Sequence, residues 1–292
     1  MNSNEQFFAD NILKFAEELY KKGDRQLLIL LKNQKVNRGL ILQEIANIIL
    51  RYNVVKDCMD LSLLEQSKLY KSLSIKIDML LSAEIDLERG QIGTLLKDIA
   101  VDKYYSSSYL LSLGMEFGLN KISNKSLNKI ICEKINGKSY SDRLWKNKND
   151  IAKLLKSEVK KFLSGETNLN KIEQVIKGRY NSNAYNTKRL VQTETARVIE
   201  GVNDVWQEQY NIKYVMYSGT LDSKTCNDCG EHDGQVFEVD KKPVQLPKHP
   251  MCRCTYIGLP SKDYKPKTRL DNKTKEKVDW KAYNEWKQEQ DL

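Results

Sequence analysis

Residues 226–254 have the sequence CNDCGEHDGQVFEVDKKPVQLPKHPMCRC, which contains four of the chain's six cysteines and both of its histidines. Cys226 and Cys229 form a Cys-x-x-Cys pair, and His249, Cys252 and Cys254 follow in a His-Pro-x-Cys-x-Cys arrangement. Two thiols at this spacing can bind one metal ion from a tight turn, and donors from a distant loop can complete a tetrahedron. The stretch therefore predicts a small module held together by a Cys/His cluster.

Five donors are more than the four that a structural zinc site requires. If residues 252–254 are extended, Cys252 and Cys254 point to opposite faces, which disfavours binding of one ion by both. We therefore expect a structural zinc at Cys226, Cys229, His249 and Cys252, with Cys254 as a substitute for one of them. Zinc would supply folding energy to a module with few apolar residues. The alternatives are reduced cysteines that pack without metal, or a disulfide formed late.

The same donor types also occur in catalytic sites. A nuclease of the HNH type needs a general-base histidine outside the metal ligands, and His232, beside Asp233, is the histidine left for that role. Because His232 lies in a glycine-flanked turn, we expect it to be a surface residue instead. A deaminase needs a His-x-Glu motif before its cysteine pair, and none precedes Cys226. Thiol–disulfide exchange needs a helix N-terminus at the pair, whereas Gly230 and Gly234 favour turns.

A second group of polar residues lies on a helix expected from about residue 186 to 210. Arg189, Thr193 and Arg197 are spaced by four residues and share a face, with Glu194 three residues before Arg197. This row can lock the helix onto a partner loop through charge-assisted hydrogen bonds, or it can be an exposed ion-pair ladder of little energetic value. Asp222, just before the cysteine pair, is a natural partner for one arginine.

The first part of the chain, up to about residue 120, predicts helix almost throughout, because apolar residues recur every three or four positions. The clearest stripes are Leu40, Ile41, Ile45, Ile48 and Ile49, and Leu73, Ile77, Leu80, Leu81 and Ile85. Ser62 is an expected N-cap, and breaks are expected at Gly23, residues 37–39 and Gly90. The pattern predicts a bundle of long antiparallel helices.

The later segments predict more helices and then short strands. We expect a turn at Asn136 and Gly137, a helix at residues 141–162, a loop at 164–166, a cap at Thr167 or Asn168, and a polar turn at 180–185. Strands are expected at residues 214–217, 235–239 and 255–257. The fold class is mainly α, with a helical N-terminal region followed by a small α+β module. The expected regions are a helical bundle at 1–120, a basic helical segment at 121–185, the Cys/His module at 186–260 and a charged tail at 261–292. We expect this tail to be flexible until a last amphipathic turn or two that places Trp280, Tyr283 and Trp286 on one side.

Positive charge is concentrated in one quarter of the sequence. Residues 121–192 contain 17 Lys and Arg against 6 Asp and Glu, a net charge of +11, whereas the other 220 residues carry 31 basic against 33 acidic groups, or −2. Such a segment can follow nucleic-acid phosphates; a solvated face of Lys-rich helices is the alternative. Because no apolar run approaches the ~20 residues that span a bilayer and no signal pattern is present, we expect no membrane partner and a cytoplasmic site of synthesis.

Taken together, these motifs resemble the phage Mu F-like, or head morphogenesis, family of minor capsid proteins. The pattern comprises Arg189-Leu190, Thr193-Glu194, Arg197, Asp222, Cys226-x-x-Cys229, Asp233-Gly234 and Pro247-x-His249-Pro250-x-Cys252-Arg253-Cys254. Residues 137–145 and Ser164-Gly165 are similar to forms found in phages of Gram-positive bacteria. The resemblance covers residues 137–260, and the N-terminal helices match in helical character alone.

The resemblance implies a minor structural protein of a phage head, associated with the portal vertex and acting in capsid assembly or in DNA packaging or ejection. Its implied partners are the portal protein, capsid and scaffold proteins, and packaged DNA contacted without sequence specificity. Its implied location is the virion, reached from the host cytoplasm during assembly. Some family members carry toxin or transferase domains after this module; 32 residues follow Pro260 here, too few for an enzyme domain, so we expect no catalytic residue. The alternative function is a metal-dependent nuclease that uses the Cys/His module.

Overall fold

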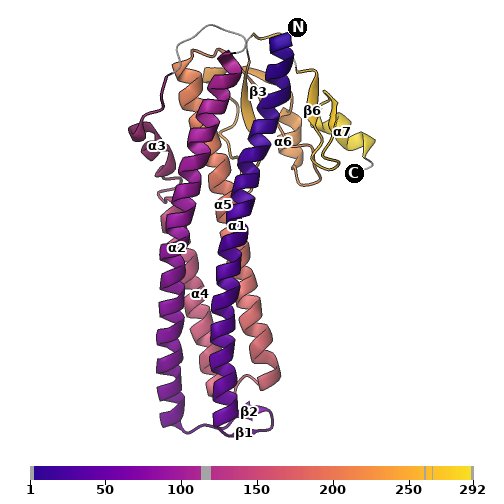
Figure 1. The fold of residues 1–292 in the computed structure, drawn as a ribbon. Coiled ribbons are helices and arrows are strands. Elements are labelled where there is room, and N and C mark those ends of the chain that lie inside the picture. The colour runs from indigo at the N-terminus through magenta and orange to yellow at the C-terminus, as the bar shows by residue number, and fades with distance from the viewer. Residues whose placement is uncertain (1–2, 113–119, 260, 265, 291–292) are drawn as a thin grey trace. The chain divides into compact units, whose positions relative to one another are not determined.

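The computed structural model describes residues 3–112, 120–259, 261–264 and 266–290 (Figure 1). The chain forms two compact units, each built from segments far apart in sequence. Unit 1 comprises residues 1–24, 94–133 and 191–292, and unit 2 comprises residues 25–93 and 134–190. Three helices contribute residues to both units: α1 (Ser3–Arg51), α2 (Leu63–Ser112) and α5 (Leu169–Gln209). The units therefore interleave along the chain, whereas the sequence suggested consecutive regions.

Unit 2 is a bundle of four helical stems that lie side by side (Figure 1). The stems are the second half of α1, the first part of α2, the whole of α4 (Tyr140–Leu163) and the first part of α5. A short hairpin of β1 (Val54–Val55) and β2 (Cys58–Met59) joins α1 to α2. The expected stripes face the core of this unit, where Ile41, Ile45, Ile48, Leu73, Ile77 and Leu81 are buried. The prediction of a bundle of long helices is confirmed for this unit.

Local sequence signals fix where several of these helices begin. Ser62 precedes α2, and its backbone N–H and its hydroxyl both donate to Glu65. Ser139 precedes α4 in a capping box with Asp142. Asn168 precedes α5, and its Oδ1 accepts from the backbone N–H of Lys171 at 2.9 Å. Before it, Gly165 adopts a φ of +77°, which an L side chain rarely adopts.

The breaks expected at Gly23, residues 37–39, Gly90 and residues 180–185 are wrong, because α1, α2 and α5 continue through them. Tertiary contacts outweigh the weak helix propensity of these residues. In α1, Asn37 is buried and its side-chain amide donates to Glu84 at 2.8 Å. In α5, the side chains of Tyr180 and Asn183 are buried in unit 2.

A buried polar layer crosses the core of unit 2. The Nζ atom of Lys148 lies 2.9 Å from Oε2 of Glu84 and 2.6 Å from Oε1 of Glu88, and all three side chains are fully buried. Gln34 donates to Glu88 and to Thr187 of α5, both at 2.8 Å. All four stems thus contribute a polar side chain to one layer, which restricts how the helices can pair.

Unit 1 contains a three-stranded antiparallel sheet of order β4–β3–β5. The strands are β3 (Tyr214–Ser218), β4 (Val236–Glu238) and β5 (Thr255–Leu259), so the three expected strands are confirmed. The second part of α5 covers β5: a Cβ added to Gly258 would lie 3.1 Å from the ring of Trp206. Shorter elements complete the unit: α3 (Asn124–Ile131), α6 (Asn227–His232) and a 3-10 helix (Val239–Lys241). The fold class, mainly helical with a small strand-containing module, is confirmed.

The last amphipathic turn expected at Tyr283 and Trp286 is confirmed, but the flexible tail expected before it is wrong, because the charged C-terminal segment is folded. It forms β6 (Thr268–Leu270), β7 (Lys277–Asp279) and α7 (Tyr283–Glu289). Tyr283 and Trp286 are buried together with Leu221, so the two aromatic side chains of the expected turn supply apolar area to this charged segment. Pro260, the end of the expected module, lies outside the described residues. In the described part of the chain, no helix combines the length and apolarity that crossing a membrane requires.

Candidate metal centre

The cysteine pair lies at the start of the short helix α6. Cys226 is its N-cap residue, and the Sγ atom of Cys226 accepts from the backbone N–H of Cys229 at 3.4 Å. A backbone amide directed at sulfur stabilises a thiolate, as a metal ligand requires. The pair is therefore arranged as a knuckle whose two sulfur atoms face the same side.

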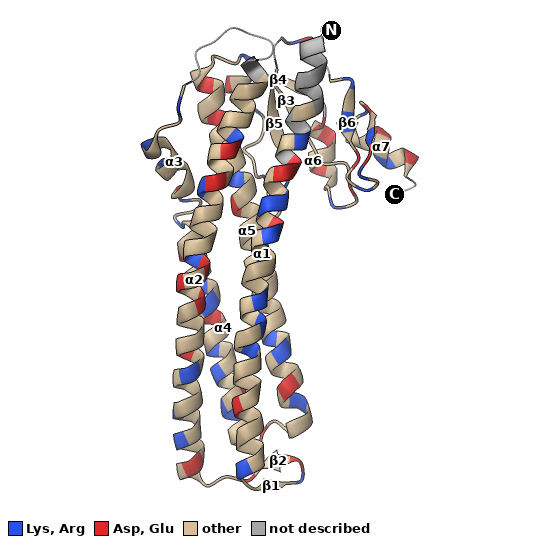
Figure 2. Ribbon diagram, in the orientation of Figure 1, with Lys and Arg blue, Asp and Glu red and all other residues tan. Residues whose placement is uncertain are grey.

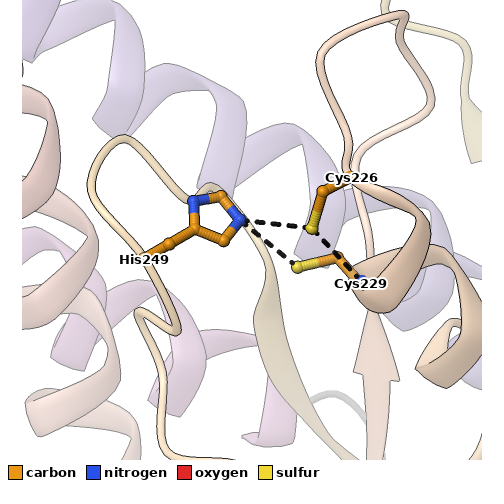
Figure 3. Close-up of side chains that lie close together, drawn as sticks. All are labelled: Cys226, Cys229 and His249. Carbon is orange, nitrogen blue, oxygen red and sulfur yellow. Dashed lines mark hydrogen bonds between the residues drawn. The ribbon is translucent and has the colours of Figure 1, made fainter.

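His249 completes a three-donor group with this knuckle (Figure 3). Its Nε2 atom lies 3.4 Å from Sγ of Cys226 and 3.6 Å from Sγ of Cys229. In a tetrahedral zinc site, bonds of about 2.3 Å to sulfur and about 2.0 Å to nitrogen hold these atoms about 3.6 Å apart. The observed distances fit that geometry, so the two distant loops converge as the sequence predicted.

The surroundings of the donors also suit a metal. Nδ1 of His249 lies 3.0 Å from the carbonyl oxygen of Pro250, an acceptor that favours the tautomer with the proton on Nδ1. In this tautomer the lone pair of Nε2 faces the two sulfur atoms. Burial raises the pKa of the Tyr217 hydroxyl, and the neighbouring Cys254 and Cys229 raise it further. This hydroxyl therefore stays protonated beside the cysteine sulfur atoms.

Cys252 and Cys254 lie on the same side, not on opposite faces. Their sulfur atoms and that of Cys229 are within 4.8 Å of one another, so Cys229 belongs to two three-donor groups. The expectation from strand alternation is wrong because β5 begins only at Thr255. Before it the chain turns: Met251 has a φ of +62°, and the backbone N–H of Cys252 donates to the carbonyl oxygen of His249 at 3.1 Å. The five donors thus form one cluster that can hold a metal ion.

The loop that carries His249 and Cys252 is fixed at three points. Lys248 forms an ion pair with Asp228 of α6. The backbone N–H of Met251 donates to Oγ1 of Thr193 on α5 at 3.0 Å. Arg253 forms an ion pair with Asp222. Asp222 therefore has the arginine partner that was expected of it, although that arginine comes from the His-Pro-x-Cys-Arg-Cys motif and not from α5.

The Thr-Glu-x-x-Arg motif on α5 has a structural role at a helix end. Nε of Arg197 lies 2.6 Å from Oε2 of Glu194, and both side chains are buried. The two terminal nitrogens of Arg197 donate to the carbonyl oxygens of Ile130 and Ile131, at 2.5 and 3.0 Å. These carbonyls lie at the end of α3, where a helix leaves its last carbonyls without regular partners; that of Ile130 also accepts from the backbone N–H of Glu133 at 3.4 Å. Glu194 and Arg197 therefore lock α5 onto the end of α3 and do not form an exposed ion-pair ladder. Arg189, the first residue of the row, belongs to unit 2 and is exposed.

The two sites considered for catalysis, His232 and the cysteine pair, have defined environments. His232 is half-buried, and its Nδ1 atom lies 2.8 Å from the carbonyl oxygen of Asp228 in the same helix. The cysteine pair lies at the start of the helix α6 and not in the expected turn. The absence of a helix therefore no longer argues against thiol–disulfide exchange. The stronger argument against exchange is the position of His249, which holds both sulfur atoms in a ligand arrangement.

A buried acid and a buried base near the sheet escaped the sequence analysis. Glu200 of α5 accepts from Asn203 at 2.9 Å and from the backbone N–H of Tyr256 at 3.3 Å. Burial raises the pKa of Glu200 to about 7, although hydrogen bonds from Thr255 and Tyr256 act against the rise. Burial lowers the pKa of Lys103 to about 8, against the attraction of Glu200. A single acidic residue in a helix gives no sequence signal of such burial.

Comparison with known proteins agrees with the motifs. Residues 149–257 match the model of a family described as Phage Mu protein F like protein, which confirms the resemblance over this segment and supports a head morphogenesis protein. The chain is 24% identical over 203 residues to the NAD(+)--arginine ADP-ribosyltransferase EFV of Enterococcus faecalis, covering 63% of this chain and 41% of that protein. The chain thus spans less than half the length of this curated relative. No solved structure matches the chain.

Proposed function

We propose that this chain, whose residues 149–257 form a phage Mu F-like segment, is a minor structural protein of a phage head that acts at the portal vertex. Its function would be to hold other molecules together during capsid assembly and DNA packaging or ejection. It would be present in the virion, in the capsid interior or at the portal vertex, after synthesis in the host cytoplasm. Portal, capsid and scaffold proteins would be its partners.

The observation that carries this proposal is that the motif residues make contacts within the protein. Thr193, Glu194 and Arg197 hold the donor loop and the end of α3. Asp222 holds the loop through Arg253. These contacts are internal to unit 1, which supports a role of the motif in maintaining a scaffold.

Zinc is the metal that the donor set favours. Thiolates and imidazole in a tetrahedral arrangement are typical zinc ligands. Cys226, Cys229, His249 and one of the sulfur atoms of Cys252 and Cys254 would hold the ion. Bound zinc would supply folding energy by joining α6 to the loop before β5. A closed set of four protein ligands would leave no position for a substrate, which fits a structural role.

The assembly role is tested in infected cells. Affinity purification of the tagged chain is expected to recover portal protein, and mass spectrometry of mature particles is expected to detect the chain in few copies. Particles without the chain are expected to show defects in head assembly or DNA delivery. Mature particles of normal infectivity that lack this chain would contradict the proposal.

Contact with packaged DNA would use unit 2. Unit 2 contains 24 Lys and Arg against 13 Asp and Glu, a net +11, and the rest of the chain contains 24 against 26, or −2. Figure 2 shows Lys and Arg along all four stems of this unit. A basic surface that is not tied to base readout binds phosphate without sequence preference. Unit 2 thus has the same net charge of +11 as residues 121–192, and its basic residues belong to one compact unit.

Two charge-reversal variants test where DNA binds. Lys153, Lys160 and Lys171 are exposed on unit 2, whereas Lys121, Lys125 and Lys129 are exposed on unit 1, although all six lie within residues 121–192. Replacement of each set by Glu changes the net charge equally. The first variant is expected to lower the slope of log K against log salt by about 1–3, and the second to leave it near the wild-type value. Equal effects of the two sets would contradict a surface on unit 2.

The proposal includes no catalytic activity. The chain is expected to cleave neither duplex nor single-stranded DNA with magnesium, manganese or zinc present. It is also expected not to transfer ADP-ribose from NAD to an arginine-containing acceptor. Metal-dependent cleavage that disappears in His232→Ala would instead support the nuclease alternative.

A further inference from the structure

We propose that the C-terminal segment of residues 266–290, here called the clasp, holds helix α6 in place, and that clasp docking and zinc binding stabilise each other. The clasp comprises β6, β7 and α7 and lies beyond the segment that matches the phage Mu F-like family. The inference rests on the proposed metal centre and assigns it a second function, control of the C-terminal segment.

Helix α6 depends on contacts outside itself. It has six residues, fewer than an isolated helix needs to form in water. Its first turn carries the ligands Cys226 and Cys229, which face His249. It also contacts α7: a Cβ added to Gly230 would lie 2.3 Å from Cδ1 of Tyr283. The ring of Tyr283 therefore packs directly on the backbone of α6, one residue after a metal donor.

Hydrogen bonds from Tyr283 bracket the cysteine knuckle. Its hydroxyl donates to the carbonyl oxygen of Thr225, the residue before Cys226, at 2.9 Å. Its backbone N–H donates to Oδ2 of Asp233, which follows α6, at 2.7 Å. One residue of the clasp thus restrains both ends of the segment that supplies the two thiol ligands.

A buried ion pair joins the clasp to the same end of α6. Nη1 of Arg269 lies 2.6 Å from Oδ2 of Asp233, and Nη2 lies 3.2 Å from Oδ1. The guanidinium also donates to the carbonyl oxygen of Gly219 at 2.6 Å and lies 4.4 Å from the ring centre of Trp280. A bidentate pair of this kind fixes both position and orientation. Asp233, part of the motif Asp233-Gly234, therefore anchors the clasp.

Because of these contacts, zinc binding and docking of the clasp both depend on the position of α6. Zinc binds only when α6 presents both thiolates toward His249, and the clasp docks only when α6 presents Gly230 and Asp233 to Tyr283 and Arg269. Since each event orders the same helix, each makes the other more favourable, and the coupling must be equal in both directions. Loss of metal is therefore expected to release the clasp, and weakening of the clasp is expected to weaken zinc binding.

The first test measures zinc affinity of the full-length chain by competition with a chromophoric chelator. Trp286 packs on Leu221 and Tyr283, apart from the cluster that contains Cys229, Cys252 and Cys254. Trp286→Ala is expected to weaken zinc binding about tenfold, within the usual range of coupling between sites. Trp145→Ala, which removes an exposed tryptophan of unit 2, is the matched control and is expected to leave affinity unchanged. Equal affinity in both variants would overturn the proposal.

The second test uses the unaltered chain, so it does not depend on folding of a variant. Amide hydrogen exchange is compared with zinc bound and after removal of zinc by a chelator. Exchange in β6, β7 and α7 is expected to accelerate at least about tenfold without zinc, while exchange in α4 stays constant. A clasp that stays equally protected would overturn the coupling. A chain that binds no zinc would refute the metal centre itself, and the two failures are thus distinguishable.

Discussion

Nε of Arg197 donates to Oε2 of Glu194 over 2.6 Å, and each side chain is 3% exposed. Removal of one partner of a buried ion pair leaves an uncompensated charge and costs about 3–5 kcal/mol. Arg197→Ala is therefore expected to lower the free energy of unfolding by that amount in denaturant titrations. The control is Arg89→Ala, which breaks an exposed pair with Asp86 at the same spacing and is expected to cost below about 1 kcal/mol. Equal losses would show that Arg197 does not lock α3.

Glu200 predicts how stability changes with pH. Burial raises its pKa from 4.5 to about 7, so the folded chain retains a proton that the unfolded chain releases. The free energy of unfolding is therefore expected to fall as pH rises from 4.5 to 7, by up to about 3 kcal/mol from this group. Glu200→Gln binds no proton and should remove this part of the slope. The measurement is the difference in unfolding free energy between wild type and variant at pH 5, 6 and 7. Taking this difference cancels the pH dependence of zinc binding, which both chains share. A difference that is constant over this range would contradict the burial effect.

Lys148 predicts the behaviour of the polar layer in unit 2. Lys148→Met leaves Glu84 and Glu88 buried without a counter-charge and is expected to cost about 3–5 kcal/mol of unfolding free energy. Adding Glu84→Gln and Glu88→Gln to the same chain removes both charges and is expected to recover most of that loss. A triple variant as unstable as the single variant would show that the lysine acts through packing alone.

Serine substitutions predict which sulfur atoms bind zinc. Cys229 belongs to both donor groups, so Cys229→Ser is expected to weaken zinc binding by more than about a hundredfold. Cys252→Ser is expected to do the same, whereas Cys254→Ser is expected to have a smaller effect if Cys254 is only a substitute ligand. Zinc content after dialysis against a weak chelator measures the order. A larger loss in Cys254→Ser than in Cys252→Ser would exchange their roles.

Much of the metal centre was accessible from the sequence because its signals are local. The Cys-x-x-Cys pair and the His-Pro-x-Cys motif each place their donor atoms within a few residues, and a tetrahedral site requires the two groups to meet. The geometry between Cys252 and Cys254 was not accessible. It depends on Met251, whose positive φ turns the chain, and methionine gives no sign of that conformation in a sequence.

Long-range partnerships explain the other differences. Asp233 was recognised as part of a motif, but its partner Arg269 lies 36 residues later in a charged stretch that resembles a solvated tail. Likewise, Asn183 suggested a turn by its propensity, yet it is buried in unit 2. Periodicity identifies which face of a helix is apolar, whereas only tertiary packing decides which polar residues become buried.

The central claim is that sulfur and imidazole ligands from two loops close around one zinc ion that holds a scaffold together. X-ray absorption at the zinc edge, combined with metal analysis of the purified full-length chain, tests it most directly. We predict one zinc per chain, with three sulfur atoms at about 2.3 Å and one nitrogen at about 2.0 Å. Zinc well below one per chain would contradict the claim, and an oxygen ligand in an open fourth position would point to catalysis instead.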